Sequence, residues 1–379
     1  MAAHSDRYPL ISDLRTRASR RLPSFAWAYL DSATGDERAM HRNEEALAEI
    51  ELVPQMLKGP LAPDTSVTLF GQEFASPIGI APVGMSGLIW PGADLVLADL
   101  ARRENIPHTL STVATTDPET VGPRVGNNGW FQLYAPRDRA IRDDLLDRVE
   151  AAGFNVLVVT ADVPAPSRRE RQRKAQIRVP PRIGPSLVAQ TIIRPAWTAA
   201  LLRNGMPRFR TVEPYLDSHS LASVAGFVGA TLGGTLSWEY LDELRQRWKS
   251  TLVIKGLIDL DDIERSLAAG VDGVIVSNHG GRQLEAAPAS IRVLPGVVDR
   301  VAERVPVIFD SGVRSGADVA RAISLGADFV MAGRPFYYGL GALGADGAGH
   351  AFSILHEGLV NVMQQTGCAQ LSDLRNRRA

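Results

Sequence analysis

The sequence predicts an α/β protein, namely a closed (β/α)8 barrel, and three observations support this prediction. Short apolar runs without alternation of polar residues recur along the chain, as in parallel strands that are buried on both faces. Segments with helical spacing of apolar residues separate these runs, and several of the segments end in glycine. Eight such units follow one another at a spacing of roughly 20–25 residues, which is typical of a barrel. A doubly wound sheet would need a glycine fingerprint after the first strand, and none is present.

The predicted strands are rich in β-branched residues and are bounded by turn residues. They cover residues 77–83, 106–112, 130–134, 156–162, 252–256, 273–278, 305–311 and 329–333. The clearest helical patterns cover residues 92–105, 138–153, 237–248, 260–270 and 316–326. We therefore expect one domain over residues 1–379, with the barrel formed by residues 76–174 and 235–365.

Two segments lie outside the regular alternation. Residues 1–75 precede the first strand and are predicted to form a helical extension, most clearly at 22–30 and at 43–52. Residues 175–234 form an insertion after the fourth strand. Its part from 175 to 212 mixes apolar residues with six arginines and contains no acid: Arg178, Arg182, Arg194, Arg203, Arg208 and Arg210. Such a composition fits a segment that lies on anionic lipid, and an active-site lid or a subunit contact fits it equally well.

Composition excludes several classes of protein. A net charge of −1 argues against a general nucleic-acid binder. Cys368 is the only cysteine, so no disulfide can form within the chain, and we expect it to be a small packed residue. No window approaches the roughly 20 apolar residues of a spanning helix, and no signal-peptide core is found near the start. We expect a cytoplasmic enzyme, with contact to the inner face of the cell membrane as the alternative that the insertion raises.

Three predicted strands lead into ionisable side chains that make chemical sense together. The fourth strand ends at Asp162, the fifth contains Lys255, and the sixth leads into Ser277-Asn278-His279-Gly280-Gly281-Arg282-Gln283. His279 can accept a proton near neutral pH, and a nearby Asp162 would orient its ring. Arg282 can hold a carboxylate through two parallel hydrogen bonds. A buried Lys255 could stabilise negative charge on an electron-accepting ring, although an exposed strand end or a Schiff-base lysine is the alternative.

The last two strands predict a phosphate site. Asp310-Ser311-Gly312-Val313-Arg314 follows the seventh strand, and Ala332-Gly333-Arg334-Pro335 follows the eighth. Loops at these places in barrels commonly bind phosphate through backbone N–H groups. The sequence contains no motif with the spacing of metal ligands and no Gly-x-Ser-x-Gly hydrolase motif.

Five ordered motifs at these strand ends resemble one family, the FMN-dependent α-hydroxy acid dehydrogenases and oxidases. The resemblance runs from about Leu22 to Ser372. Its motifs are Ser277–Leu284, Phe131-Gln132-Leu133-Tyr134, Val253-Ile254-Lys255-Gly256, Asp310–Arg314 and Gly333-Arg334-Pro335. Within the family the chain looks most similar to the (S)-mandelate and respiratory L-lactate dehydrogenases, because Gly84 stands where many oxidases carry alanine and because the stretches Gly87-Leu88-Ile89-Trp90-Pro91 and Leu110-Ser111-Thr112 match.

The resemblance implies a role for each matching residue. His279 would be the base and Asp162 its partner, with Tyr134 bonded to the substrate hydroxyl and Lys255 against the flavin. The substrate carboxylate would be held by Arg282 and Arg169, assisted by Tyr29. The residues implied to hold FMN are Pro82, Val83, Gly84, Ser111, Gln132, Thr160, Lys255, Ser277, Asp310, Ser311, Gly312, Val313, Arg314, Gly333 and Arg334.

The implied reaction is oxidation of a mandelate-like or lactate-like (S)-2-hydroxy acid, by a homotetramer that passes electrons to a quinone-type acceptor. An oxidase that uses O2 and forms H2O2 is the alternative within the family, and both carbanion and hydride routes stay open. A non-catalytic flavin- or phosphate-binding barrel and an isopentenyl-type isomerase are the alternatives of other classes. Val113 replaces a tryptophan typical of glycolate oxidases, which implies a wider pocket, and the turn from Asp162 to Ser167 departs from the usual family sequence.

Overall fold

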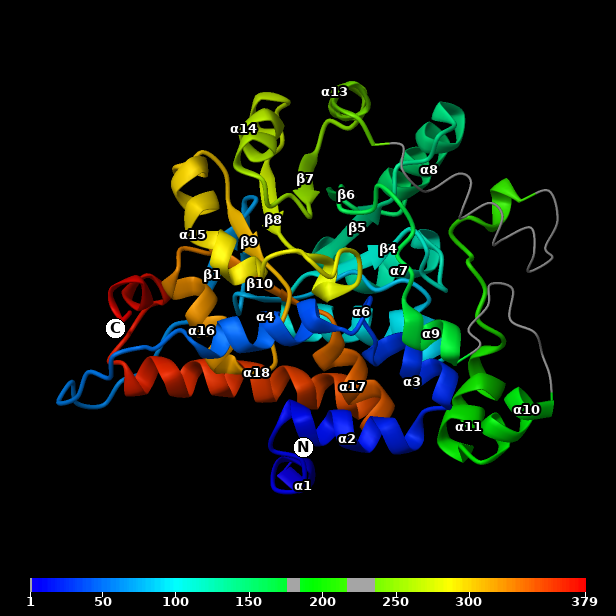
Figure 1. The fold of residues 1–379 in the computed structure, drawn as a ribbon, viewed down its shortest axis with the longest axis horizontal. Coiled ribbons are helices and arrows are strands. Elements are labelled where there is room, and N and C mark those ends of the chain that lie inside the picture. The colour runs from blue at the N-terminus through cyan, green and yellow to red at the C-terminus, as the bar shows by residue number, and fades with distance from the viewer. Residues whose placement is uncertain (1, 176–184, 217–235) are drawn as a thin grey trace.

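Eight parallel strands close into a barrel at the centre of the molecule (Figure 1). The structure is a computed structural model, and it describes residues 2–175, 185–216 and 236–379. The strands are β3 (Ile78–Ile80), β4 (His108–Ser111), β5 (Gly129–Leu133), β6 (Val156–Thr160), β7 (Thr251–Lys255), β8 (Gly273–Val276), β9 (Val307–Phe309) and β10 (Phe329–Ala332). Each strand pairs with the next along the chain, and β10 pairs with β3 to close the barrel. The predicted fold class is confirmed, and each of the eight strands lies within its predicted segment or one residue beyond it.

A short hairpin closes the amino-terminal end of the barrel. Strands β1 (Val67–Leu69) and β2 (Gln72–Phe74) pair antiparallel. Phe74 packs edge-on against Phe329 inside the barrel, with ring centroids 5.8 Å apart, and Phe70 lies 5.7 Å from Trp130. The helical prediction for residues 1–75 is wrong here, because these strands of three residues each are too short to show a period of their own.

Helices cover the outside of the barrel. They are α5 (Ser86–Ile89), α6 (Ala93–Glu104), α7 (Pro118–Val125), α8 (Arg139–Ala151), α13 (Trp238–Arg247), α14 (Leu260–Ala268), α15 (Ser290–Val301), α16 (Gly316–Ser324), α17 (Arg334–Leu343) and α18 (Ala345–Gln365), with one turn of 3-10 helix, η1 (Gly126–Asn128), before β5. Several begin at a side chain that accepts a backbone N–H, such as Asp138 for α8, Ser237 for α13 and Ser315 for α16. All five helices that the sequence predicted between the barrel strands are present.

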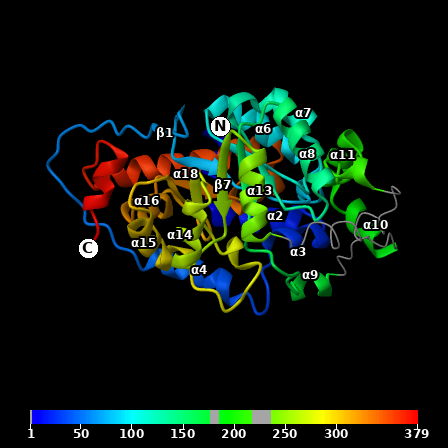
Figure 2. The same cartoon turned by 90° about the horizontal axis from the view of Figure 1, so that it is seen from above.

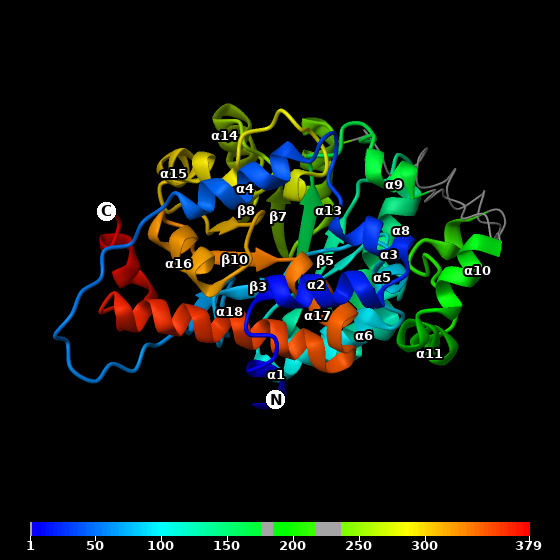
Figure 3. The ribbon, with the colours of Figure 1, turned by 60° about the horizontal axis from the view of Figure 1, so that its bottom comes forward.

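The amino-terminal segment packs against the carboxyl-terminal helices. It contains α1 (Ala2–Ser5), α2 (Ile11–Arg21), α3 (Ser24–Asp31) and α4 (Arg38–Ala48), and α2 lies beside α17 (Figure 3). Helix α4 begins five residues before the predicted start at 43, following a left-handed turn at Glu37 (φ 64°). It also ends earlier than predicted, at Ala48, and the chain that follows forms bridges from Leu52 and Asp64 to Arg378 and Gln370, beside the final turn η4 (Leu371–Asn376).

The described part of the insertion forms helices on one side of the barrel mouth. They are α9 (Glu170–Lys174), just before the insertion, then α10 (Pro185–Ile192), α11 (Pro195–Asn204) and the single turn η2 (Glu213–Tyr215) (Figures 1 and 2). Trp197 is buried against Phe25 of α3, and its indole N–H donates to the Ile89 carbonyl at 3.0 Å. Arg178 and Arg182 of the predicted basic segment lie outside the described residues. Among the helices of the described ranges, none is long and apolar enough to cross a membrane.

Candidate active site

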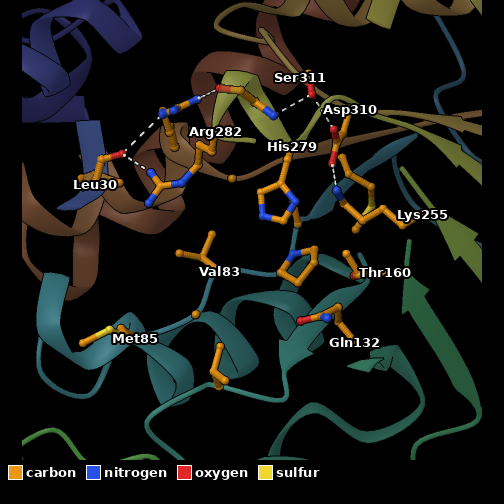
Figure 4. A pocket seen from close by; sticks show the side chains of 18 of the residues that line it. Leu30, Val83, Met85, Gln132, Thr160, Lys255, His279, Arg282, Asp310 and Ser311 are labelled. Atoms are coloured by element: carbon orange, nitrogen blue, oxygen red, sulfur yellow. Dashed lines mark hydrogen bonds and ion pairs between the residues drawn. The ribbon is translucent and has the colours of Figure 1, made fainter. Parts of the chain in front are cut away.

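A cavity of about 490 Å³ opens at the carboxyl ends of the barrel strands (Figure 4). Every strand of the barrel or the loop that follows it contributes to the wall. Examples are Val83 after β3, Gln132 in β5, Lys255 in β7 and Ser311 after β9. The carboxyl ends of parallel strands converge at one end of a barrel, so side chains that are far apart in the sequence meet here. The volume is in the range of sites that hold a cofactor together with a small substrate.

His279 is fixed in this cavity by the loop that follows β8. The loop forms the turn η3 (His279–Gly281), in which His279 has a φ of 60° and Gly280 a φ of 63°. Asn278 holds the turn in shape: its side chain accepts the Gly281 N–H at 3.1 Å and exchanges two hydrogen bonds with Asn43 of α4, at 2.8 and 2.7 Å. A left-handed backbone at a non-glycine residue is strained, and such strain is concentrated at functional sites.

Asp162 orients the imidazole of His279. Its Oδ1 lies 2.8 Å from His279 Nδ1, which leaves Nε2 as the free nitrogen of the ring. Burial lowers the pKa of His279, and Asp162 opposes that effect without cancelling it. The ring is therefore neutral near pH 7, with Nδ1–H donated to Asp162 and Nε2 available to accept a proton. Burial alone would raise the pKa of Asp162, but His279 and Lys255 together lower it, so the carboxylate is charged.

Lys255 is buried in the barrel wall and is surrounded by oxygen atoms. Its Nζ donates to Ser277 Oγ at 2.8 Å and lies 3.3 Å from an Asp310 oxygen and 4.0 Å from Asp162. Burial lowers the pKa of a lysine, but here Asp310 and Asp162 outweigh it and the pKa is raised. The alternative of an exposed strand end is wrong, because the residue is 4% exposed. The ammonium group stays charged, which argues against the Schiff-base alternative, since that chemistry needs a neutral amine.

Arg282 is a cation that forms no ion pair with a carboxylate of the described residues. Its Nη1 donates to the carbonyl oxygens of Tyr29, Leu30 and Ser32 at 3.0, 3.4 and 3.0 Å. Burial, together with the nearby charge of Arg169, lowers the pKa of Arg282 to about 9. Within the described ranges, none of Arg169, Arg282 and Arg334 forms an ion pair with an acid. A cavity with three unmatched guanidinium groups is suited to anionic ligands.

Two tyrosines and Arg169 complete the polar wall. Tyr29 donates to the Gly84 carbonyl at 2.9 Å, and the guanidinium of Arg282 lies over its ring at 5.2 Å. Burial, assisted by Asp162, raises the pKa of Tyr134 to about 12, so its hydroxyl stays a donor. Arg169 begins α9 with a φ of 43° and donates to Gln283 at 3.2 Å. These groups can bind a carboxylate and a neighbouring hydroxyl at once.

A buried carboxylate, Asp31, joins the elements that carry these groups. It accepts hydrogen bonds from Arg15 at 2.7 and 3.0 Å, from Arg171 at 2.9 Å and from Tyr338 at 2.7 Å. Burial alone would raise the pKa of Asp31, but these donors lower it to about 2. Arg171 also binds Glu37 at 2.9 Å, so α9 is fixed to the turn between α3 and α4. Sequence reasoning missed Asp31, since an acid at the end of a short apolar helix gives no signal of its partners.

The rest of the cavity fits FMN, which is a flat ring with carbonyl groups joined to a phosphate. The Nε2 of Gln132 is buried and has no partner among the described atoms, while its Oε1 accepts from Ser111 at 2.8 Å. A ligand carbonyl would satisfy this donor. At the other end lie Arg314, Arg334 and the first turn of α17, whose N–H groups suit an anion. A side chain at Gly312 (φ 95°) would meet Asn43 at 3.0 Å, so the close approach of this loop to α4 requires glycine.

Most of the residues expected from the sequence line this one cavity. Three do not: Ser111, Asp162 and Ser277 lie behind the wall, where they hold Gln132, His279 and Lys255 respectively. Several other lining residues, most of them apolar, were given no role in the site from the sequence. These are Leu30, Ala81, Met85, Ile89, Val163, Pro166, Gln172, Phe209, Gly280, Met331 and Ala332. Cys368 is fully buried, as expected, and does not line this cavity.

Comparisons with known proteins agree with this geometry. The family model described as FMN-dependent dehydrogenase matches residues 18–379. An L-lactate dehydrogenase of Alcaligenes faecalis is 36% identical over 369 residues, which are 96% of each chain. An L-lactate dehydrogenase of Xanthobacter autotrophicus is also 36% identical, over 96% of this chain and 94% of that protein.

Solved structures give the same result. A structure of (S)-mandelate dehydrogenase, described as a monotopic membrane protein, superposes with a TM-score of 0.91 at 31% identity over 98% of both chains. A mandelate oxidase superposes with a TM-score of 0.82 at 30% identity over 97% of both chains. The residues that fit FMN therefore lie in a chain whose relatives are named for hydroxy acids.

Proposed function

The chain belongs to the FMN-dependent dehydrogenase family, and from that premise we propose that it oxidises an (S)-2-hydroxy acid to the 2-oxo acid. One observation carries the proposal. The imidazole of His279, held by Asp162 at 2.8 Å, lies in the same cavity as two guanidinium groups that have no acidic partner among the described residues. A base beside a carboxylate-binding pair suits a substrate that bears a removable proton next to its acid group.

The positions of the residues support a proposed role for each of them. Arg282 and Arg169 bind the substrate carboxylate, with Tyr29 beside Arg282, and Tyr134 donates its hydroxyl to the substrate oxygen. Nε2 of His279 accepts one proton, and Asp162 stabilises the imidazolium that forms. When bound, FMN supplies the two-electron acceptor for the reaction. The proton taken by Nε2 is the hydroxyl proton in a hydride route and the proton on carbon 2 in a carbanion route, and the same residues serve both routes.

The residues that would hold FMN divide into two groups. Gln132, Thr160 and Lys255 offer donors at the base of the barrel mouth, beside the loop from Pro82 to Gly84. The buried ammonium of Lys255 would stabilise negative charge on a reduced ring in a site shielded from water. At the far end the loops Asp310–Arg314 and Gly333–Arg334 would hold the phosphate.

The insertion supports a membrane-bound quinone as the electron acceptor. Four apolar side chains of α10, α11 and the segments that follow them are each more than half exposed: Ile192, Ile193, Leu202 and Met206. Arg203 is exposed beside them, as expected for contact with anionic lipid. Transfer to O2, as in an oxidase, is the alternative, because mandelate oxidases share the fold.

The proposed reaction is tested by anaerobic mixing of the FMN-bound protein with (S)-mandelate and (S)-lactate while the visible absorbance of the flavin is followed. We expect bleaching by at least one of the acids, and none in a His279→Ala variant that still binds FMN. Colour that persists in the wild-type protein with both acids would refute the proposal. Subsequent admission of air separates the acceptors, since rapid return of colour with peroxide indicates an oxidase.

The membrane contact is tested by changing Ile192, Ile193, Leu202 and Met206 to serine and measuring binding to vesicles of anionic lipid. We expect the variant to lose vesicle binding while keeping its FMN. The matched control changes Met56 and Leu57, two exposed apolar residues of the segment between α4 and β1, which runs on the other side of the molecule from α10 and α11 (Figure 1). Equal binding of all three proteins would show that this surface does not contact lipid.

A further inference from the structure

One aromatic side chain of the cavity wall comes from the insertion. Phe209 follows α11 on the segment that returns from the insertion toward β7, and it lines the cavity together with Ile89, Val113 and Val163. The returning segment continues into Thr211 and Val212, which are both buried. A residue of the long connection between β6 and β7 therefore forms part of the site itself.

The returning segment is anchored to the barrel by a network centred on Arg148 of α8. The guanidinium donates to the Thr211 carbonyl at 2.8 Å and forms two hydrogen bonds with Glu119 of α7, at 2.6 and 3.2 Å. It also donates to the Tyr215 hydroxyl at 3.1 Å, and that hydroxyl donates to Asp144 at 2.6 Å. Since Thr211 is two residues from Phe209, these bonds fix where the phenyl ring enters the cavity.

The outgoing half of the insertion supports the adjacent wall. The indole of Trp197 donates to the Ile89 carbonyl, and Asn204 donates to the Pro91 carbonyl at 3.3 Å. Ile89 is fully buried and lines the cavity. The returning segment thus contributes Phe209 to one apolar wall. The outgoing half of the insertion supports the neighbouring part of that wall, at Ile89.

The order of strands places the elements that carry this wall across the barrel mouth from the loop of His279. The anchors of the returning segment lie on α7 and α8, which follow β4 and β5, and Val113 also follows β4. In the closed order β10-β3-β4-β5-β6-β7-β8-β9, strand β8 lies four places from β4, so it is directly across the barrel. His279 and Arg282 follow β8. A substrate whose carbon 2 faces Nε2 of His279 can therefore direct its side chain across the mouth, toward the wall that contains Phe209.

We propose that Phe209 is a specificity-determining residue, which completes an apolar subsite for the side chain of the substrate. The inference rests on the proposed oxidation of a 2-hydroxy acid and names its substrate class: acids with an aromatic or large alkyl side chain are preferred to lactate. An aromatic side chain would bury its faces and edges against Phe209, Val113 and Ile89, whereas the methyl group of lactate has far less apolar surface to bury against this wall. Arg148 is a positioning residue for Phe209.

The experiment measures binding of two carboxylates that cannot be oxidised, phenylacetate and acetate, to the FMN-bound protein by calorimetry. We expect phenylacetate to bind the wild-type protein on the order of tenfold more tightly than acetate, and Phe209→Ala to lose most of that preference while its acetate affinity is unchanged. Arg148→Met should also lower the ratio of phenylacetate affinity to acetate affinity, and Arg148→Lys should keep part of the wild-type ratio. The matched control is Phe70→Ala, which removes an identical ring at the opposite end of the barrel.

A wild-type protein that does not prefer phenylacetate, or a Phe209→Ala variant that keeps the wild-type ratio, would overturn the inference. A lowered ratio of phenylacetate affinity to acetate affinity in Phe70→Ala would overturn the inference as well, because loss of any phenyl ring from the barrel would then have the same effect. Failure of the proposed oxidation has a different signature: the wild-type protein would bind phenylacetate, but neither (S)-mandelate nor (S)-lactate would bleach the flavin.

Discussion

Replacing Arg282 with methionine should separate stability from ligand binding. The guanidinium is held in the cavity without an acidic partner in the part of the chain that the structure describes, and burial together with Arg169 lowers its pKa to about 9. Methionine has a similar length and no charge. We expect the variant to be at least as stable as the wild-type protein when no carboxylate is present, and to bind carboxylates far more weakly.

The magnitudes follow from the surroundings of Arg282. A fall of its pKa from the ordinary value to about 9 corresponds to a free-energy cost on the order of 5 kcal/mol for holding the charge in the folded protein. Methionine removes that cost but also removes three hydrogen bonds to carbonyl groups, worth about 1 kcal/mol each. These carbonyls keep other donors: Arg334 bonds those of Leu30 and Ser32, and Gln172 bonds that of Tyr29. The net expectation is an increase in stability of up to about 2 kcal/mol.

Binding should change in the opposite direction. Loss of a desolvated charge pair costs about 2–5 kcal/mol, which is roughly a 30- to 5,000-fold weaker affinity for acetate. Urea unfolding in the absence of carboxylate measures the first effect, and calorimetric titration of the FMN-bound protein measures the second. Arg282→Lys serves as the control, because it keeps the charge and loses the planar pair of donors. Wild-type affinity in Arg282→Met, or a loss of stability greater than about 2 kcal/mol, would refute the reasoning.

Three further predictions concern buried charges. Asp162→Asn should slow flavin reduction on the order of 100-fold. It should also move the acid limb of the pH profile of flavin reduction to lower pH, because Asp162 raises the pKa of His279. Stopped-flow measurements across pH test both effects, and an acid limb that does not move would contradict the prediction. Asp31 has a folded-state pKa of about 2, below the ordinary 3.8, so its stabilisation of about 2 kcal/mol is present above pH 3.8 and disappears as the pH falls toward 2. The difference in unfolding free energy between wild type and Asp31→Asn should therefore shrink between neutral pH and about pH 3, and a constant difference would argue against it. Lys255→Met leaves Asp310 and Asp162 buried without their cation and should destabilise the protein by about 3–5 kcal/mol in urea unfolding, whereas Lys249→Met, at an exposed position, should not.

The barrel strands could be predicted because burial on both faces leaves a plain apolar run in the sequence. The helices α17 and α18 could not be found in this way. Helix α17 is buried nearly all round, so its apolar residues show no helical period, and glycines such as Gly339 and Gly347 lie where the two helices touch. A side chain at Gly339 would lie 2.0 Å from the Gly347 carbonyl oxygen. Close packing of the two helices, rather than helix propensity, therefore requires glycine at these positions.

The polar side of the candidate site could be predicted for a similar reason. His279, Lys255 and Asp162 each follow or end a buried strand, and parallel strands bring their carboxyl ends together. Phe209 and Asp31 carry no such signal. Each is placed by partners that are distant in the sequence, Arg148 for the first and Arg15 with Arg171 for the second, and a linear pattern does not encode such contacts.

Arg282 and Arg334 share their anchors. Both guanidinium groups donate to the carbonyls of Leu30 and Ser32, and Arg334 also donates to Gly280, inside the turn that carries His279. One arginine belongs to the wall assigned to the substrate and the other to the wall assigned to the phosphate. An engineer who reshapes the backbone from residue 30 to residue 32 to accept a new acid would therefore also alter retention of the prosthetic group. Screens for altered substrate range should therefore measure flavin content as well as activity. A variant that has lost its FMN is as inactive as one whose substrate pocket no longer fits the acid.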